Sequence, residues 1–69
     1  MIPREVVLAG SYAQFDNYVH NTGRPRREFI FADRIERVIG LESYVVRKVG
    51  TWRDLPAALV AEVERRARR

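Results

Sequence analysis

Residues 5–14 read EVVLAGSYAQ, a short apolar run that meets a glycine and is followed at once by a helix-start signal. The apolar run over residues 6–9 predicts a buried strand over about residues 5–9, and Gly10 predicts a tight turn. Ser11 and Gln14 have the spacing of a capping box, in which the serine oxygen accepts the Gln14 N–H and the glutamine side chain reaches back to the Ser11 N–H. This abrupt change from strand to helix is typical of the first unit of a parallel α/β domain.

The rest of the chain repeats the alternation of strand and helix. Gly23 and Gly40 are placed to end helices, because glycine adopts the left-handed conformation without steric cost. Asp33 and Glu36 repeat the spacing of the capping box, and proline suits the first turn of a helix. The predicted elements after the first strand are a helix over residues 12–21, a strand over 28–32, a helix of barely two turns that begins at Asp33, a strand over 44–49 and a helix that starts near Pro56.

The predicted order β-α-β-α-β-α makes one α/β domain over residues 1–69, with a three-stranded parallel sheet that resembles half of a Rossmann fold. We expect the strand order 2-1-3, because the first strand is uniformly apolar while the third carries Arg47 and Lys48, and charge within a strand is typical of a sheet edge. The second crossover, residues 33–43, is close to the shortest length that joins parallel strands. An order of 1-2-3, or a partly open third strand, therefore remains an alternative.

Composition narrows the classes of function. The chain of 69 residues has no cysteine and one histidine, so a disulfide framework, a thiolate metal site and a catalytic triad all lack parts. We therefore expect no metal, no cofactor and no catalytic residues. No apolar run approaches the roughly 18 residues of a membrane span, and the first residues lack the apolar core of a signal peptide, so we expect no membrane association and a cytoplasmic location. A chain this short buries only about 60% of its unfolded surface, which favours a homodimer.

The carboxyl ends of the parallel strands are predicted to meet at one edge of the sheet, which is where open α/β sheets bind ligands. Helix N-termini there offer N–H groups to an anion, and arginines offer cationic donors. Most glycines of a dinucleotide motif are missing, and the same residues also serve as turns, caps and a tryptophan lid over a small core. We name this set the glycine rim and expect it to bind a partner or a nucleotide-like ligand: Gly10, Ser11, Tyr12, Asp33, Arg34, Gly50, Thr51, Trp52 and Arg53.

The opposite edge of the predicted sheet gathers positive charge. The chain has 13 basic and 9 acidic residues, a net charge of +4, and much of the excess is predicted at this edge. Such a cluster attracts phosphates without reading bases, although arginines at the end of a helix also complement the helix dipole. We name this set the arginine rim and expect nucleic acid to bind it only nonspecifically: Arg4, Arg24, Arg26, Arg27, Arg65, Arg66, Arg68 and Arg69.

Four segments together resemble small uncharacterised α/β proteins, Rossmann-like in fold, that are encoded by bacteriophages, chiefly of actinobacteria. The segments are VLAGSYAQFDNYV at residues 7–19, FIFAD at 29–33, VIGL at 38–41 and VVRKVGTW at 45–52. The resemblance implies a phage accessory protein that works in the host cytoplasm, and it supplies no catalytic residues. It rests on Gly10, Tyr12, Gln14, Phe15, Gly40, Gly50, Thr51, Trp52 and Pro56.

Three classes of function follow from these patterns. The first is a non-enzymatic interaction module that binds a host or phage protein and also associates with itself, which small size, an edge strand and the missing catalytic pairs favour. The second is a small-molecule binder at the glycine rim. The third is nonspecific binding of nucleic acid by the arginine rim.

Overall fold

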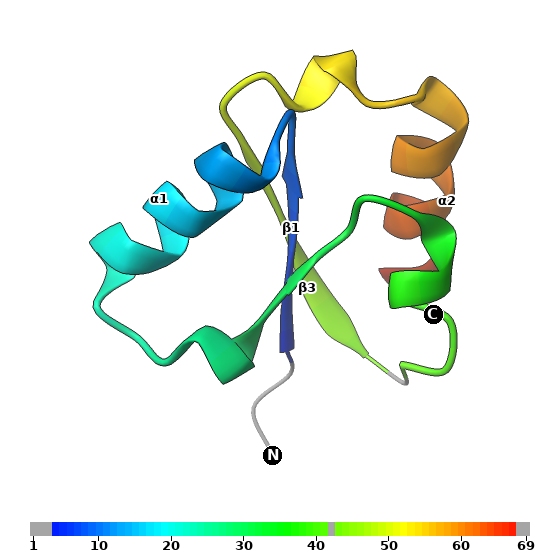
Figure 1. Ribbon diagram of the computed structural model, residues 1–69. Helices are drawn as coiled ribbons and strands as arrows, with labels where there is room; N and C mark the ends of the chain where they lie inside the picture. Colours follow the sequence, from blue (N-terminus) through cyan, green and yellow to red (C-terminus); the bar gives the residue numbers. More distant parts are fainter. Residues whose placement is uncertain (1–3, 42, 68–69) are drawn as a thin grey trace.

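The computed structural model describes residues 4–41 and 43–67, which form a small α/β domain (Figure 1). Its strands and helices are β1 (Arg4–Ala9), α1 (Tyr12–Thr22), β2 (Phe29–Phe31), β3 (Tyr44–Val49) and α2 (Ala57–Ala67). Three short 3-10 turns join them: η1 (Arg26–Glu28), η2 (Ile35–Arg37) and η3 (Trp52–Asp54).

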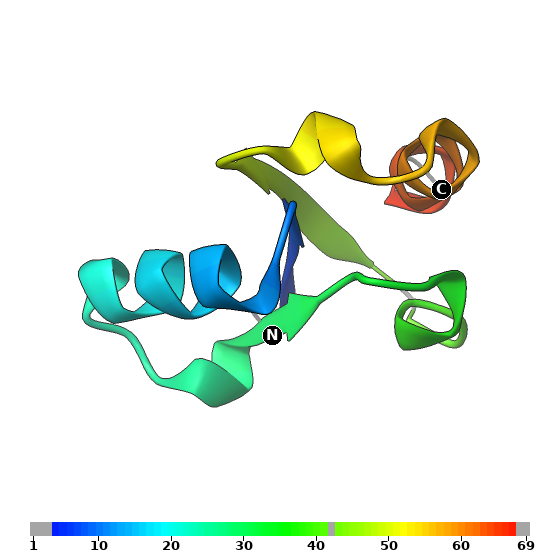
Figure 2. The same cartoon turned by 45° about the horizontal axis from the view of Figure 1, so that its top comes forward.

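The three strands form one parallel sheet in the order β2-β1-β3, which confirms the predicted order 2-1-3. Val6 of β1 lies opposite Ile30 of β2 on one side and Val46 of β3 on the other. The sheet separates α1 from α2, which cover opposite faces of it (Figure 2). Because β1 is paired along both sides and covered on both faces, the four residues 6–9 are fully buried, as their uniformly apolar character predicts.

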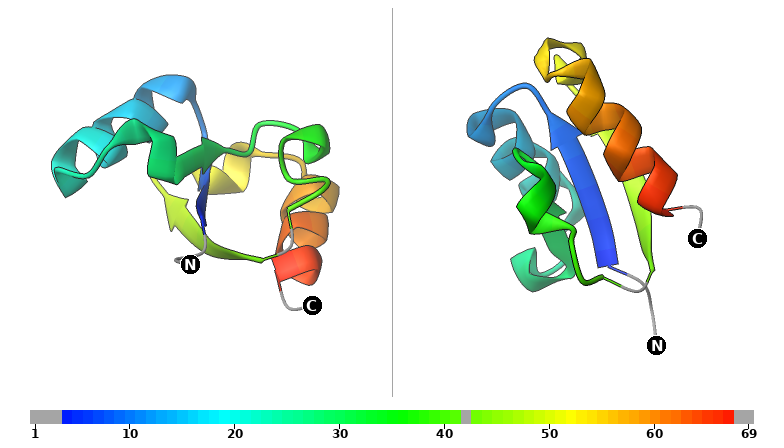
Figure 3. Two further views of the ribbon diagram at one scale, coloured as in Figure 1. Left: turned by 90° about the horizontal axis from the view of Figure 1, so that it is seen from below. Right: turned by 90° about the vertical axis from the view of Figure 1, so that its right-hand side faces the viewer.

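The core consists of two apolar clusters, one on each face of the sheet. Successive side chains of a strand point to opposite faces, so Val7 and Ala9 pack with α1 while Val6 and Leu8 pack on the α2 side. The α1 side adds Phe15, Val19 and Phe29, and the α2 side adds Ala32, Val38, Tyr44 and Val63. The view in Figure 3 from the α2 side shows β1 running between the two helical layers.

Both predicted signals for α1 are present. The Ser11 Oγ accepts the Gln14 N–H at 3.3 Å, and Gly23 ends the helix with φ of 72°, its N–H donating to the carbonyl of His20. The second long helix begins one residue after Pro56, whose carbonyl accepts the Val60 N–H at 3.2 Å.

The helix predicted from Asp33 is wrong, because the structure has only the three-residue turn η2 there. The Asp33 carboxylate caps no N–H group and instead contacts Arg37 at 3.3 Å and Arg34 at 3.9 Å. The physical cause is the length of the crossover, since residues 32–43 must pass β1 and return along the sheet. A helix advances only about 1.5 Å per residue against about 3.3 Å for extended chain, so a longer helix would leave too few residues to reach β3.

An ionised network fastens α1 to the sheet. Glu5 of β1 is buried on the α1 face, with 8% of its surface exposed. Its carboxylate accepts hydrogen bonds from the Tyr18 hydroxyl and from Arg24 at 2.9 Å, and the Arg47 Nε of β3 lies 3.8 Å away. Burial raises the pKa of Glu5, but the hydrogen bonds from Tyr18 and Arg24 and the two positive charges outweigh it, so that the pKa lies below its ordinary value.

We expect Glu5 to make the stability of the fold depend on pH. Since its pKa is lower in the folded chain, the stabilisation is complete above the ordinary value of 4.5 and is lost as the pH falls through the folded value. Glu5→Gln should cost about 1–3 kcal/mol at pH 7 and should flatten this acid dependence. Urea unfolding between pH 7 and pH 3 measures both effects. Equal acid dependence in the variant and the native chain would show that the network does not set it.

Candidate functional site

The two glycine turns of the glycine rim lie side by side and are joined through one side chain. The Gln14 Oε1 accepts the Gly10 N–H at 3.0 Å, the Thr51 N–H at 3.0 Å and the Thr51 hydroxyl at 3.1 Å. We name this arrangement the Gln14 joint. The predicted return bond of the capping box is therefore wrong in one detail, because the glutamine reaches Gly10 and β3's loop instead of Ser11. The top of Figure 1 shows the loops after β1 and β3 together.

Gly10 is required by the close approach of the two loops, and Gly50 by its positive φ. A Cβ at Gly10 would fall against the Thr51 side chain and 2.7 Å from its carbonyl oxygen. Gly50 has φ of 56°, a conformation that residues with a Cβ rarely adopt, and a Cβ there would also force the Gln14 side chain to shift. The short turns that the sequence placed at a ligand site thus pack against each other.

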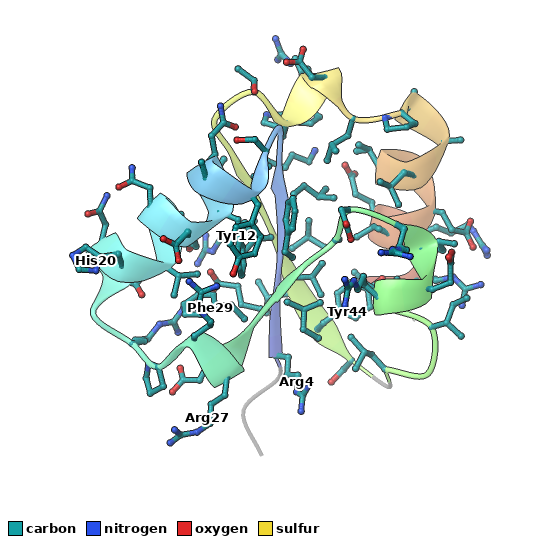
Figure 4. All side chains as sticks on the ribbon, viewed as in Figure 1. Arg4, Tyr12, His20, Arg27, Phe29 and Tyr44 are labelled. Carbon is teal, nitrogen blue, oxygen red and sulfur yellow. The ribbon has the colours of Figure 1, made fainter. Side chains whose placement is uncertain are left out.

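The remaining members of the glycine rim face different surroundings. Tyr12 is 57% exposed and its ring lies 5.8 Å from that of Phe31, on the α1 side of the sheet (Figure 4). Trp52 packs on the opposite cluster as a cover for the core, with the Lys48 ammonium 4.6 Å and the Arg53 guanidinium 5.3 Å from its ring. The structure therefore brings together Gly10, Gly50 and Thr51, with Ser11 beside them as the N-cap of α1.

Asp33 and Arg34 lie apart from that joint, at the mouth of an apolar groove that the sequence did not predict. The groove has a volume of about 580 Å³ and runs along one flank of α2, facing η2. We name it the α2 groove. Its lining residues are Asp33, Arg34, Ile35, Ile39, Pro56, Ala58, Leu59, Glu62 and Arg66. No signal in the sequence points to it, because it is the structure that leaves Ile39 of the short crossover 55% exposed.

The arginine rim is divided between the two faces of the sheet. On the α1 side, Arg24 contacts Glu5 and lies 4.6 Å from the Phe29 ring, while Arg26 contacts Asp16 and stacks near the Tyr12 ring. On the α2 side, Arg65 and Arg66 both contact Glu62, at 2.5 Å and 2.9 Å. Arg4 and Arg27 extend into solvent (Figure 4), and Arg68 and Arg69 lie outside the described residues.

Chemically, the glycine rim offers little to an anion in this conformation. The N–H groups of Gly10 and Thr51 converge on one point, as donors in an anion site do, but the Gln14 oxygen already occupies that point. Among residues 4–41 and 43–67, no group of three or more His, Asp or Glu side chains is placed to hold a metal ion. Within the same residues, neither helix has the length and apolar character needed to cross a membrane.

The comparisons with known proteins add no relative. No protein-family model, no curated protein and no solved structure matches this chain.

We expect Gly10→Ala to open the Gln14 joint, because the new methyl group would meet a backbone carbonyl that has little freedom to move. The cost should be about 1–3 kcal/mol of unfolding free energy, and the Thr51 amide proton should exchange faster with solvent. Gly23→Ala is the matched control, since a Cβ at Gly23 meets nothing within 4 Å and costs only the strain of its positive φ. Unchanged Thr51 exchange in Gly10→Ala would mean that the two loops are not held together this way.

Proposed function

We propose that this protein is a small non-enzymatic interaction module, an accessory protein of bacteriophage type that binds other proteins in the host cytoplasm and associates with itself as a homodimer. The observation that carries the proposal is the open edge of β3 over residues 45–49. This strand has six residues and pairs with β1 along one side only, within the part of the chain that the structure describes. An unpaired edge offers a row of N–H and C=O groups to a further strand.

The charged side chains of β3 are not placed to prevent a further strand from pairing with its edge. Charged side chains on an edge strand oppose further pairing when they stand over the edge. Here the Arg47 Nε lies 3.8 Å from Glu5 of β1, and the Lys48 Nζ lies 2.7 Å from Glu64 of α2. Both side chains thus lean back over the protein, while Val45, on the same face as Arg47, remains 45% exposed.

A second copy is the first occupant that we propose for this edge. A domain of this size has a thin core, and pairing β3 with β3 of another copy would extend the sheet and bury Val45 in both. The resemblance to phage proteins and the absence of a catalytic pair in the sequence support an accessory role over an enzymatic one.

The other two functions have less support. A nucleotide-like ligand at the glycine rim would have to displace the Gln14 oxygen from the Gly10 and Thr51 N–H groups. Nucleic acid at the arginine rim would meet Arg24, Arg26, Arg65 and Arg66 already paired with carboxylates on two separate faces. Neither surface has an observation in its favour as specific as the open β3 edge.

We expect a dimer in sedimentation experiments at high micromolar concentration, weakened about tenfold by Val45→Lys. The substitution adds a positive charge in both copies on the face of β3 that already carries Arg47, and each unfavourable cross-strand charge costs up to about 1 kcal/mol.

Ile39→Lys is the matched control for this experiment. It replaces another exposed apolar residue, on the α2 side, by the same cation, and it should leave the dimer unchanged. A monomer at every concentration, or a dimer that Ile39→Lys disrupts and Val45→Lys does not, would contradict the role proposed for the β3 edge.

A further inference from the structure

A cavity of about 390 Å³ lies along the outer edge of β2, at the side of the sheet opposite to β3. All three residues of β2 line it. Because successive side chains of a strand point to opposite faces, this cavity follows the edge of the strand and not one face of the sheet. We name it the β2 cavity. Tyr12 and Phe15 of α1, Arg26 of η1, Asp33 and Arg37 of η2 complete its lining.

The backbone of Phe31 is open toward the β2 cavity. The Ala32 N–H donates to the Val7 carbonyl of β1 at 3.1 Å. In a parallel pair of strands alternate residues direct their backbone groups to the same neighbour, so the N–H and C=O of Phe31 point away from β1. No other residue that the structure describes bonds to these two groups. The cavity therefore has one hydrogen-bond donor and one acceptor side by side on its strand wall.

This edge is too short to pair well with a further strand. A strand pairs through alternate residues, and in β2 only Phe29 and Phe31 direct their backbone groups outward. The Phe29 N–H already donates to the Arg26 carbonyl within η1. One complete pair of donor and acceptor is left, at Phe31. The edge of a nucleobase, which carries a donor and an acceptor on one rigid ring, matches such a single pair.

An aromatic wall stands beside the Phe31 backbone. The Phe31 ring stacks on Phe15 at 5.2 Å, and the Tyr12 ring meets it edge to face at 5.8 Å. Tyr12 is held in place by the Arg26 guanidinium, which donates to its hydroxyl, yet 57% of Tyr12 is exposed. Exposed aromatic rings of this kind are the surfaces on which bases stack in proteins.

The β2 cavity carries one positive charge in excess. Its charged lining residues are two arginines, Arg26 and Arg37, and one carboxylate, Asp33. Arg26 is paired with Asp16, whereas the Arg37 guanidinium contacts only Asp33, at 3.3 Å, among the residues that the structure describes. Arg37 is therefore the group in the cavity best able to bind an anion. The charged neighbours outside the lining balance one another: Arg24, Arg27 and Arg34 against Asp16, Glu28 and Glu36.

We propose that the β2 cavity binds a nucleoside monophosphate. The edge of the base bonds to the Phe31 backbone, its plane lies against the Tyr12 ring, and the phosphate meets Arg37. The volume of the cavity is within the range of small-molecule sites. This inference goes beyond the interaction module and does not depend on the β3 edge, from which β1 separates the cavity. It also differs from a ligand at the Gly10 and Gly50 turns, because no bond of the Gln14 joint has to break.

Three small molecules test which parts of the ligand are needed. The probe is adenosine monophosphate, whose base has an amino donor beside a ring-nitrogen acceptor. Adenosine lacks the phosphate, and ribose phosphate lacks the base. In an NMR titration of the isotope-labelled protein we expect adenosine monophosphate to shift the Phe31 amide signal and to bind at least tenfold more tightly than either of the other two.

Two arginine variants locate the phosphate. Arg37→Gln keeps most of the side chain and removes the cation, so it should weaken binding of adenosine monophosphate at least tenfold and leave binding of adenosine unchanged. Arg34→Gln is the matched control, because Arg34 also contacts Asp33 but does not line the β2 cavity. It makes the same change in net charge and should alter binding less than twofold.

Two tyrosine variants locate the base. Tyr12→Leu should weaken binding of both adenosine monophosphate and adenosine at least fivefold, whereas Tyr12→Phe keeps the ring and should bind both as the native chain does. Because Tyr12 is largely exposed, both variants should keep the native circular dichroism spectrum.

Several outcomes would overturn the proposal. These are an unchanged Phe31 amide signal, equal binding of ribose phosphate, and equal loss in Arg37→Gln and Arg34→Gln. A deoxyadenosine oligonucleotide that binds more than tenfold more tightly than adenosine monophosphate would also overturn it, because the ligand would then be a nucleic acid strand. Native affinity for adenosine monophosphate in Val45→Lys, whose dimer is weakened, would support the β2 cavity as a site separate from the β3 edge.

Discussion

The geometry of this protein depends on one constraint, which is that residues 32–43 must carry the chain from one edge of the sheet past β1 to the other edge. The crossover from β1 to β2 has room for the three turns of α1, whereas this second crossover has room for η2 alone. The two faces of β1 are therefore covered by different structures. The helix α1 covers one face, and α2 together with the short turn η2 covers the other. The α2 groove is the direct result of that difference, and so is the exposure of Ile39.

Much of the fold could be predicted because the relevant signals are local or follow from topology. The apolar run over residues 6–9 of β1 indicates a strand buried on both faces, and the charges of β3 indicate an edge, so the order 2-1-3 follows. The Asp33 signal failed because a capping pattern reports only local preference. The crossover is too short to include the predicted helix, and the Asp33 carboxylate contacts Arg34 and Arg37 instead of capping N–H groups. Local rules cannot detect such competition.

The candidate sites were harder to predict, because side chains find partners from distant parts of the sequence. Gln14 was expected to bond within its own turn, but its oxygen joins Gly10 to Thr51 across the domain. The arginine rim was predicted as a single patch because its residues flank the same ends of the predicted strands and helices. In the structure four of them meet Glu5, Asp16 or Glu62, so the positive charge left to attract a ligand is smaller and lies on two faces. The α2 groove could not be predicted from the sequence, because its position depends on which residues stay exposed after the chain has folded.

The Gln14 joint also bears on the order in which the molecule is completed during synthesis. The bond from Thr51 to Gln14 connects positions separated by 37 residues, and β1 lies in register with β3 along the whole strand. While the ribosome has delivered only β1, α1 and β2, one side of β1 has no partner and the Gln14 oxygen has only Gly10 to bond. The chain loses conformational entropy when it closes a loop of that length, and the contacts between β1 and β3 offset this loss only once they have formed. The partly made sheet therefore remains incomplete until β3 has been synthesised. The central strand is therefore the first part of the sheet to be made and the last to be enclosed.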